Sequence, residues 1–260
     1  MIGVKKNKVQ VTLIQIDNYG PWTSTLGTDR EYKLQILQAE LYSSLQKSFA
    51  AKNGLVFFNK FDEMLAVTNG ISREEHKTIQ TSVQERFPFT LSMSIGVDAT
   101  PFQAHVRASR LLQMAGSAQS ELRRSVLTAD QTVEMDEAFA QIVHLDVDGI
   151  TNLTDRIPAF ETSLKVMRSY VDLMSAFSRL DSLLFYMGGD NFMGVTGELT
   201  DEFIAHELDQ HVINGLPLKF GVGRAQTARR AADLATMNLE RVRQNRGATY
   251  GILPRLREGR

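Results

Sequence analysis

Cysteine is absent from this 260-residue chain, and its absence excludes disulfide bonds, thiolate zinc sites and a cysteine nucleophile together. An excess of charge of either sign is also absent, because 29 basic and 30 acidic side chains leave a formal net charge of −1. Such a balance offers no broad surface for nucleic acid or an anionic membrane, so any anionic ligand must be held locally.

Long apolar runs are absent as well. No run approaches the roughly 20 residues of a membrane span. The first residues, MIGVKKNK, lead into a strand-like segment that contains an aspartate rather than into a signal-peptide core. We therefore expect a cytoplasmic protein with neither a membrane nor a nucleic-acid partner.

What the chain does contain is an internal repeat, in which the order of segments in residues 9–119 recurs in residues 140–247. Four aspartates mark the repeat, two at strand ends and two at hairpin turns: Asp17 matches Asp146, and Asp62 matches Asp190. The offset between the copies drifts by only about one residue per segment, as short loop insertions produce. Two copies of one domain are therefore expected, over residues 1–125 and 126–260.

Each copy follows the order β-α-β-β-α-β-α, which is the ferredoxin-like plan with an added helix. Apolar residues at helical spacing indicate a long helix in each copy: Leu34, Leu37, Leu41, Leu45 and Phe49, then Val166, Tyr170, Leu173 and Phe177. Ser72 with Glu75 forms a capping box before a shorter helix, and Thr200 is the matching N-cap. The predicted class is α+β: two fused ferredoxin-like, palm-like domains, each an antiparallel sheet with helices on one face.

The paired aspartates point to a divalent cation. In this plan the first strand lies beside the hairpin strand, so Asp17 should face Asp62, and Asp146 should face Asp190. Carboxylates a few Å apart repel one another unless one is protonated or a cation lies between them. Magnesium prefers one or two carboxylates together with water and phosphate oxygens. The pattern predicts that all four aspartates are metal ligands and catalytic residues.

The segment YMGGDNFMGV, residues 186–195, places Asp190 at a hairpin apex behind Gly188 and Gly189. Glycines allow a tight turn and let a phosphate or a base approach the backbone. A Gly-Gly-Asp turn on its own is most often only a turn, but the recurrence of the aspartates favours a site. Gly188, Gly189 and Asn191 are therefore predicted to bind substrate.

The first copy differs from the second, because Asn59, Lys60 and Phe61 stand where the second copy has its glycine pair. Lys60 could therefore neutralise Asp62 in place of a metal. Against this, the segment IDNYGPW has a glycine and backbone amides suited to phosphate. Both copies thus remain candidates, and the predicted substrate-binding residues of the first are Asn18, Tyr19 and Gly20.

The stretch MGGDNF resembles the GGDEF signature of diguanylate cyclases, whose palm-like domain is shared with class III nucleotidyl cyclases, although Asn191 stands where that signature has glutamate. A fuller resemblance covers nearly the whole chain. The segments QIDNYGPWT, GLVFFNKFDEMLAVTNG, GSAQ, HLDVDGIT, GGDNFM and GVGR together resemble the GTP cyclohydrolase III family, which is seen chiefly in archaea.

That resemblance implies hydrolysis of GTP to a formylamino-pyrimidine ribosyl monophosphate with release of two phosphates, feeding riboflavin or deazaflavin synthesis. It implies a requirement for Mg2+, activation by K+, no zinc, and a homo-oligomer. By similarity to the cyclases, Arg243 is predicted to reach the triphosphate. The alternatives are a nucleotidyl cyclase, which leaves the purine ring intact, and a non-catalytic GTP-sensing module.

Other candidate residues have simpler interpretations. His206 and His211 are five residues apart and so lie on different helix faces, unlike the pair of a zinc protease motif. His144 precedes Asp146 by two on one strand face and is either a core residue or a partner that supports the site. Of Phe57 and Phe58, one should pack in the core, and the other packs there too or stacks on a base.

Overall fold

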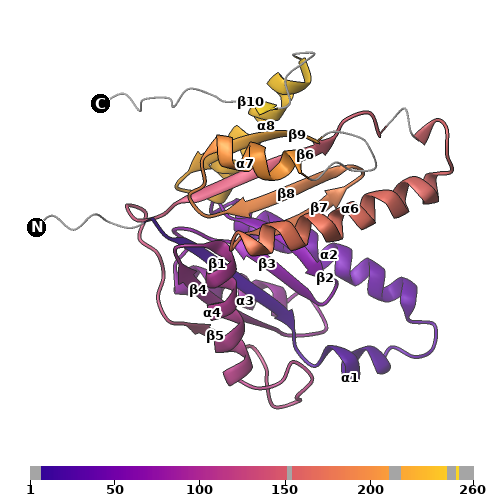
Figure 1. Cartoon of the computed structure of the whole chain (residues 1–260). Coiled ribbons are helices and arrows are strands. Elements are labelled where there is room, and N and C mark those ends of the chain that lie inside the picture. Colours follow the sequence, from indigo (N-terminus) through magenta and orange to yellow (C-terminus); the bar gives the residue numbers. More distant parts are fainter. Residues whose placement is uncertain (1–6, 151–153, 211–217, 245–249, 252–260) are drawn as a thin grey trace, which may run out of the picture. The chain divides into compact units, whose positions relative to one another are not determined.

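The computed structural model describes residues 7–150, 154–210, 218–244 and 250–251 (Figure 1). The chain forms two compact units, one of Met1–Phe139 with Gln226–Arg229 and the other of Ala140–Ala225 with Arg230–Arg260. Each unit contains a five-stranded, largely antiparallel sheet flanked by helices, which confirms the α+β class. Among the described residues, no helix is long and apolar enough to cross a membrane.

The first unit has the strand order β2-β3-β1-β4-β5, in which β5 alone pairs in parallel. Its elements are β1 (Val9–Ile16), α1 (Tyr19–Ser24), α2 (Glu31–Ala50), β2 (Leu55–Lys60), β3 (Glu63–Val67), α3 (Arg73–Gln84), β4 (Leu91–Asp98), α4 (Pro101–Met114) and β5 (Leu127–Ala129).

The second unit repeats this order as β10-β9-β6-β8-β7, again with one parallel edge strand, β10. Its elements are β6 (Ala140–Val147), α6 (Ala159–Arg179), β7 (Leu183–Gly188), β8 (Asn191–Thr196), α7 (Asp201–Asp209), β9 (Leu218–Ala225), α8 (Ala228–Gln244) and β10 (Tyr250–Gly251). The sequence repeat predicts a boundary between the two domains at residues 125 and 126. Because β5 pairs with β4, the segment up to Phe139 stays with the first unit.

The helices cover both faces of each sheet, whereas the sequence analysis expected them on one face. The long helix and the short helix share an apolar core with one face of the sheet in each unit. The last helix lies on the other face, where a glycine lets it approach the strand. A Cβ atom at Gly96 would lie 2.1 Å from the Ala104 carbonyl oxygen of α4, and one at Gly223 would lie 2.0 Å from that of Ala231 in α8.

The predicted helix starts are confirmed. The Ser72 side chain accepts from the amide of Glu75, whose own carboxylate accepts from the Ser72 amide. Thr200 accepts from the Phe203 amide at the start of α7. Each cap satisfies a backbone N–H group that the first turn of a helix leaves without a partner.

The capping glutamate should make the first unit sensitive to acid. A hydrogen bond from Lys52, at 2.7 Å, and one from the Ser72 amide lower the pKa of Glu75 from 4.5 to about 2. Its stabilising effect is therefore present above about pH 4.5 and is lost as the pH falls towards 2. The side chain is 38% exposed, so solvent screening reduces the contribution to about 1 kcal/mol.

We expect Glu75→Gln to lower the unfolding free energy by about 1 kcal/mol at pH 7 and to have no effect near pH 2. Urea unfolding followed by the fluorescence of Trp22, the single tryptophan, measures this, because Trp22 packs against Phe89 in the first unit. The neighbouring Glu74→Gln is the control. Equal losses at both pH values would contradict the prediction.

Candidate functional site

The two aspartates of the second copy meet at one end of the second sheet. Asp146 on β6 lies opposite Asn191, the first residue of β8, and the Val147 amide donates to the Asp190 carbonyl oxygen at 3.3 Å. Gly188 and Gly189 form the turn with φ values of 104° and 61°. Both values lie in the left-handed region, so the backbone conformation itself requires glycine.

The charge of Asp190 is poorly compensated. Burial raises the pKa of the Asp190 carboxyl, and the neighbouring Asp146 carboxylate raises it further. The Asn191 side-chain amide donates to Asp190 Oδ1 at 3.0 Å. A carboxylate with a raised pKa beside a second carboxylate gains from a cation between them.

Arg243 on α8 holds the other carboxylate. Its Nη2 and Nε atoms lie 2.8 Å and 3.2 Å from the two oxygens of Asp146, a two-pronged pairing. Nη1 donates to Glu240 at 2.5 Å, and Nη2 lies 3.5 Å from Asn191 Oδ1. The prediction that Arg243 reaches the triphosphate stays untested, but the structure places its guanidinium beside both Asp146 and Asn191.

His144 lies on the same strand face as Asp146 and supports this cluster. Its Nδ1 is 3.0 Å from the Thr236 hydroxyl, and its ring also hydrogen-bonds the Asn191 side chain. Burial, and next the Arg243 charge, lower the pKa of His144, which favours the neutral ring. The sequence left His144 as either a core residue or a residue that supports the site. The structure favours the second interpretation, because the His144 ring contacts Asn191.

The strand-end aspartate of the first copy has different surroundings. Asp17 accepts from Thr90 Oγ1 at 2.8 Å, from Ser92 Oγ at 2.6 Å and from the Ser125 amide at 2.8 Å. Arg123 Nη2 lies 3.3 Å from Asp17 Oδ1, and these two side chains are 1–2% exposed. The expected match of Asp17 with Asp146 is wrong, because Gln15 pairs with Glu63 where Asp146 pairs with Asn191, so Gln15 occupies the position of Asp146. In place of the expected approach to Asp62, the Asp17 side chain contacts Ser92 of β4 and the segment before β5.

In the hairpin of the first copy, Lys60 does not neutralise Asp62 as the sequence suggested. Lys60 pairs with Glu63 at 3.4 Å rather than with Asp62, and Asn59 donates to the same Glu63 oxygen at 2.6 Å. Gln15 donates to the other Glu63 oxygen. Asp62 is half-buried, and its charge is the second cause, after burial, of the raised pKa of Tyr19.

The turn after β1 binds another part of the same unit. The Asn18 amide donates to the Ala118 carbonyl oxygen at 2.7 Å, and the Gly20 amide donates to Gln119 Oε1 at 3.0 Å. The Tyr19 hydroxyl accepts from Gln38 at 2.5 Å. The backbone amides expected to bind phosphate therefore already have partners within the chain.

The two units differ in how well they fit a metal ion. In the described ranges, no three His, Asp or Glu side chains converge as a metal-binding group. Asp146 and Asp190 fit an ion that takes two carboxylates and draws its other oxygens from water and substrate, as Mg2+ does. Both Asp17 and Asp146 face a guanidinium, but the Asp17 oxygens also accept from two hydroxyl groups and a backbone amide, so Asp17 does not fit a metal ion.

Three further candidates have local roles. His206 is exposed and lies 3.1 Å from Gln210, while His211 is outside the described residues. Phe57 is buried, and Phe58 stacks on Tyr42 with ring centres 4.0 Å apart. Arg123 was not predicted from the sequence, because it lies in the charged run SELRRS, which has no strand or helix pattern.

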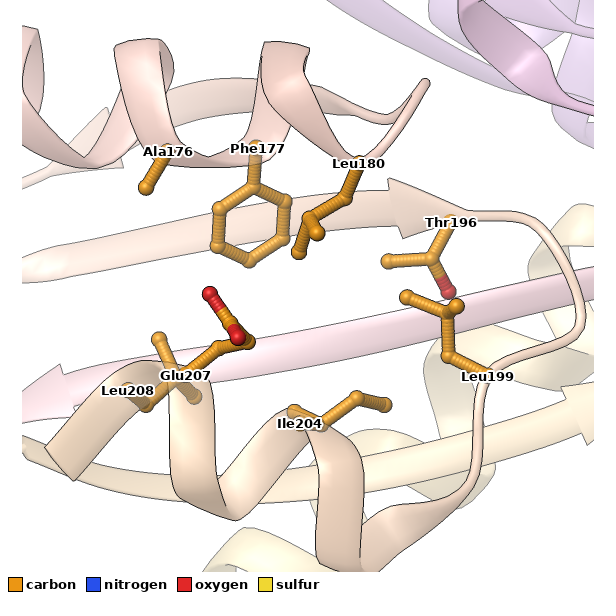
Figure 2. Close-up of a pocket in the computed structure, with 8 residues that line it drawn as sticks. All are labelled: Ala176, Phe177, Leu180, Thr196, Leu199, Ile204, Glu207 and Leu208. Carbon is orange, nitrogen blue, oxygen red and sulfur yellow. The ribbon is translucent and has the colours of Figure 1, made fainter. Parts of the chain in front are cut away.

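An apolar pocket lies elsewhere in the second unit, between α6, α7 and the end of β8 (Figure 2). Its lining residues are Ala176, Phe177, Leu180, Thr196, Leu199, Ile204, Glu207 and Leu208. Thr196 pairs with Gln141 near the start of β6, whereas Asp146 is near the end of that strand. The pocket is thus separate from the acidic cluster.

The two units repeat one α+β plan of ferredoxin-like type, each with an aspartate at its hairpin turn, and this plan defines the class of the protein. The family model for GTP cyclohydrolase III matches residues 11–253. This chain belongs to the GTP cyclohydrolase III family, which is a family of enzymes.

Curated relatives named GTP cyclohydrolase III match almost end to end. That of Methanothermobacter thermautotrophicus is 48% identical over 96% of this chain and 100% of its own length. That of Methanocaldococcus jannaschii is 42% identical over 90% of this chain and 88% of its own. The solved GGDEF domain of PA1120 from Pseudomonas aeruginosa matches 45% of this chain and 84% of its own length, at 18% identity and a TM-score of 0.37.

Proposed function

We propose that this chain hydrolyses GTP to 2-amino-5-formylamino-6-(5-phosphoribosylamino)pyrimidin-4(3H)-one and two phosphates. The imidazole ring opens, and the formyl group stays on the product. The observation that carries this proposal is the 48% identity, over 96% of the chain, to a relative named GTP cyclohydrolase III. The acidic cluster of the second unit supports it, because phosphoanhydride hydrolysis needs a cation beside the phosphates.

In this proposal Asp146 and Asp190 hold Mg2+, which when bound polarises phosphoanhydride oxygens and lowers the pKa of water. Arg243 pairs with Asp146 and offers a guanidinium suited to phosphate oxygens. Asn191 is oriented by His144 and lies beside both Asp190 and Arg243. Gly188 and Gly189 leave open space at the turn, since a Cβ atom at either would meet nothing within 4 Å.

The first copy has a structural role in this proposal. Asp17 joins β1, β4 and the segment that carries Arg123, rather than binding a metal. From the family resemblance alone, we also propose that K+ activates the enzyme, that zinc has no part, and that the product serves riboflavin or deazaflavin synthesis in the cytoplasm.

One experiment tests the reaction. GTP and Mg2+ are incubated with the protein while inorganic phosphate and the ultraviolet spectrum are followed together. We expect two phosphates for each purine ring opened, seen as a shift of the purine absorbance, and loss of both signals when EDTA removes the metal.

The alternatives give different results in the same assay. A nucleotidyl cyclase would release pyrophosphate and leave the purine spectrum unchanged. A GTP-sensing module would bind the nucleotide without releasing phosphate over time. Either result would overturn the proposal.

A further inference from the structure

Lys219 is a second cation close to the proposed metal-binding carboxylates, Asp146 and Asp190. It is the second residue of β9 and lies directly opposite Asp146 of β6 in the sheet register. Residues that face each other in an antiparallel pair point to the same side of the sheet, with Cβ atoms about 5 Å apart. The Lys219 side chain therefore leaves the sheet on the side of Asp146, which is also the side that Arg243 reaches from α8.

The turn that follows β6 holds the Lys219 ammonium. Its Nζ atom lies 2.9 Å from Oδ1 of Asp148. Asp148 comes two residues after Asp146, and two residues of chain span at most about 7 Å. The ammonium is thus close enough to Asp146 for one polyphosphate chain to contact both the lysine and a cation held by the carboxylate.

The ion pair leaves the lysine free to change its partner at little cost. The Lys219 side chain is 19% exposed, and that of Asp148 is 43% exposed. An ion pair with one partner so exposed to water contributes little to stability, because solvent screens the attraction. Phosphate oxygens are strong acceptors for an ammonium group, and a lysine binds them as a point charge on a flexible stem.

The fold does not require a lysine at this position, as the first copy shows. In the first sheet Gln15 lies opposite Ser92, just as Asp146 lies opposite Lys219 in the second. Ser92 is buried and donates to Asp17 Oδ1 at 2.6 Å. Each copy therefore joins this strand position to an aspartate that follows the first strand. A short hydroxyl is sufficient for that contact in one copy, whereas the other has a long cation.

We propose that Lys219 is a substrate-binding residue, whose ammonium leaves Asp148 and binds phosphate oxygens of the nucleotide. The inference rests on the proposed function for the identity of that nucleotide. Asp148 is then a positioning residue, because it keeps the ammonium beside Asp146 when no phosphate is bound. The exchange of one oxygen partner for another needs only rotations within the lysine side chain.

Binding of inorganic tripolyphosphate to the full chain with Mg2+, measured by titration calorimetry, tests the proposal. Lys219→Met should raise the dissociation constant about tenfold or more, because a hydrogen bond between charged groups is lost. The KM for GTP should rise by a similar factor. Lys219→Arg should keep most of the affinity, since a guanidinium also binds phosphate. Lys8→Met, which removes the lysine of an ion pair in the first unit, is the control and should leave binding unchanged.

Asp148→Asn separates phosphate binding from a structural role of the pair. Asp148 competes with phosphate for the ammonium, so removal of its charge should lower the tripolyphosphate dissociation constant about twofold or more. A pair that only joined β9 to the turn would be broken by either substitution, and binding would then weaken in both variants. A rise in the dissociation constant in both Lys219→Met and Asp148→Asn, or no change in Lys219→Met, would overturn the proposal.

The same variants distinguish this site from the reaction. Tripolyphosphate binding that depends on Lys219, in a chain that opens no purine ring, would support the site and overturn the proposed function. Ring opening by Lys219→Met at the wild-type KM would support the proposed function and overturn the site. A wild-type chain that binds no tripolyphosphate would overturn the site as well.

Discussion

Replacing Asp190 by asparagine should lower the rate of phosphate release from GTP by about 100-fold or more and leave the fold intact. The change removes a charge that the proposed cation needs but alters little volume. Stability should not fall, because burial and Asp146 already disfavour the ionised form of this group. Phosphate release at saturating GTP and Mg2+ measures the effect, and thermal unfolding checks the fold.

The internal repeat supplies the control for this variant. Asp62→Asn makes the same substitution at the matching hairpin of the first copy, where Lys60 and Asn59 already bind the neighbouring Glu63. We expect the Asp62 variant to retain most of the activity. The opposite result, with activity lost in the Asp62 variant and kept in the Asp190 variant, would move the chemistry to the first unit.

Replacing Arg123 by methionine should lower the unfolding free energy of the first unit by about 3 kcal/mol at pH 7. The substitution leaves the Asp17 carboxylate buried without its counter-charge, and breaking a buried pair costs about 3 to 5 kcal/mol. We expect the lower end, because Thr90, Ser92 and the Ser125 amide still donate to Asp17. Trp22 fluorescence in urea reports this unit.

Arg124 provides the matched comparison, since it is adjacent in sequence but exposed. Arg124→Met should change the unfolding free energy by less than about 0.5 kcal/mol. Equal effects of the two substitutions would show that the Asp17–Arg123 pair contributes little. The double variant Asp17→Asn/Arg123→Met should recover part of the loss, because it removes both charges at once.

The repeat, the strands, the long helices and the caps could all be predicted from the sequence because each depends on a local pattern. The capping box at Ser72 needs only residues within one helical turn. The α2 core positions follow from apolar residues at helical spacing, and four of the five expected ones, Leu34, Leu41, Leu45 and Phe49, are buried. The aligned glycines Gly96 and Gly223 also indicate where the last helix of each unit packs. Their role is to let that helix lie close to the strand, and this is clear only from the contact itself.

The arrangement of the candidate sites was harder to predict from the sequence, because it depends on residues that are far apart in the chain. Asp17 follows the end of β1 and meets Arg123 from the loop before β5, whereas Asp146 lies within β6, at the position of Gln15, and meets Arg243 from α8. Arginines in charged segments usually face solvent, so the sequences around Arg123 and Arg243 do not indicate that these residues pair with aspartates. The similar spacing of the aspartates predicted equal sites, but the strand registers place Asp17 two residues beyond the position of Asp146, so the two environments differ.

The Asp17–Arg123 pair means that one half of the chain has a counter-ion built into the polypeptide. A covalently attached guanidinium cannot be chelated, diluted or exchanged for another element. The first unit can therefore keep its acidic strand end neutralised whatever the supply of dissolved metal. The Mg2+ proposed for the reaction would then be needed in the second unit, where burial and Asp146 raise the pKa of Asp190.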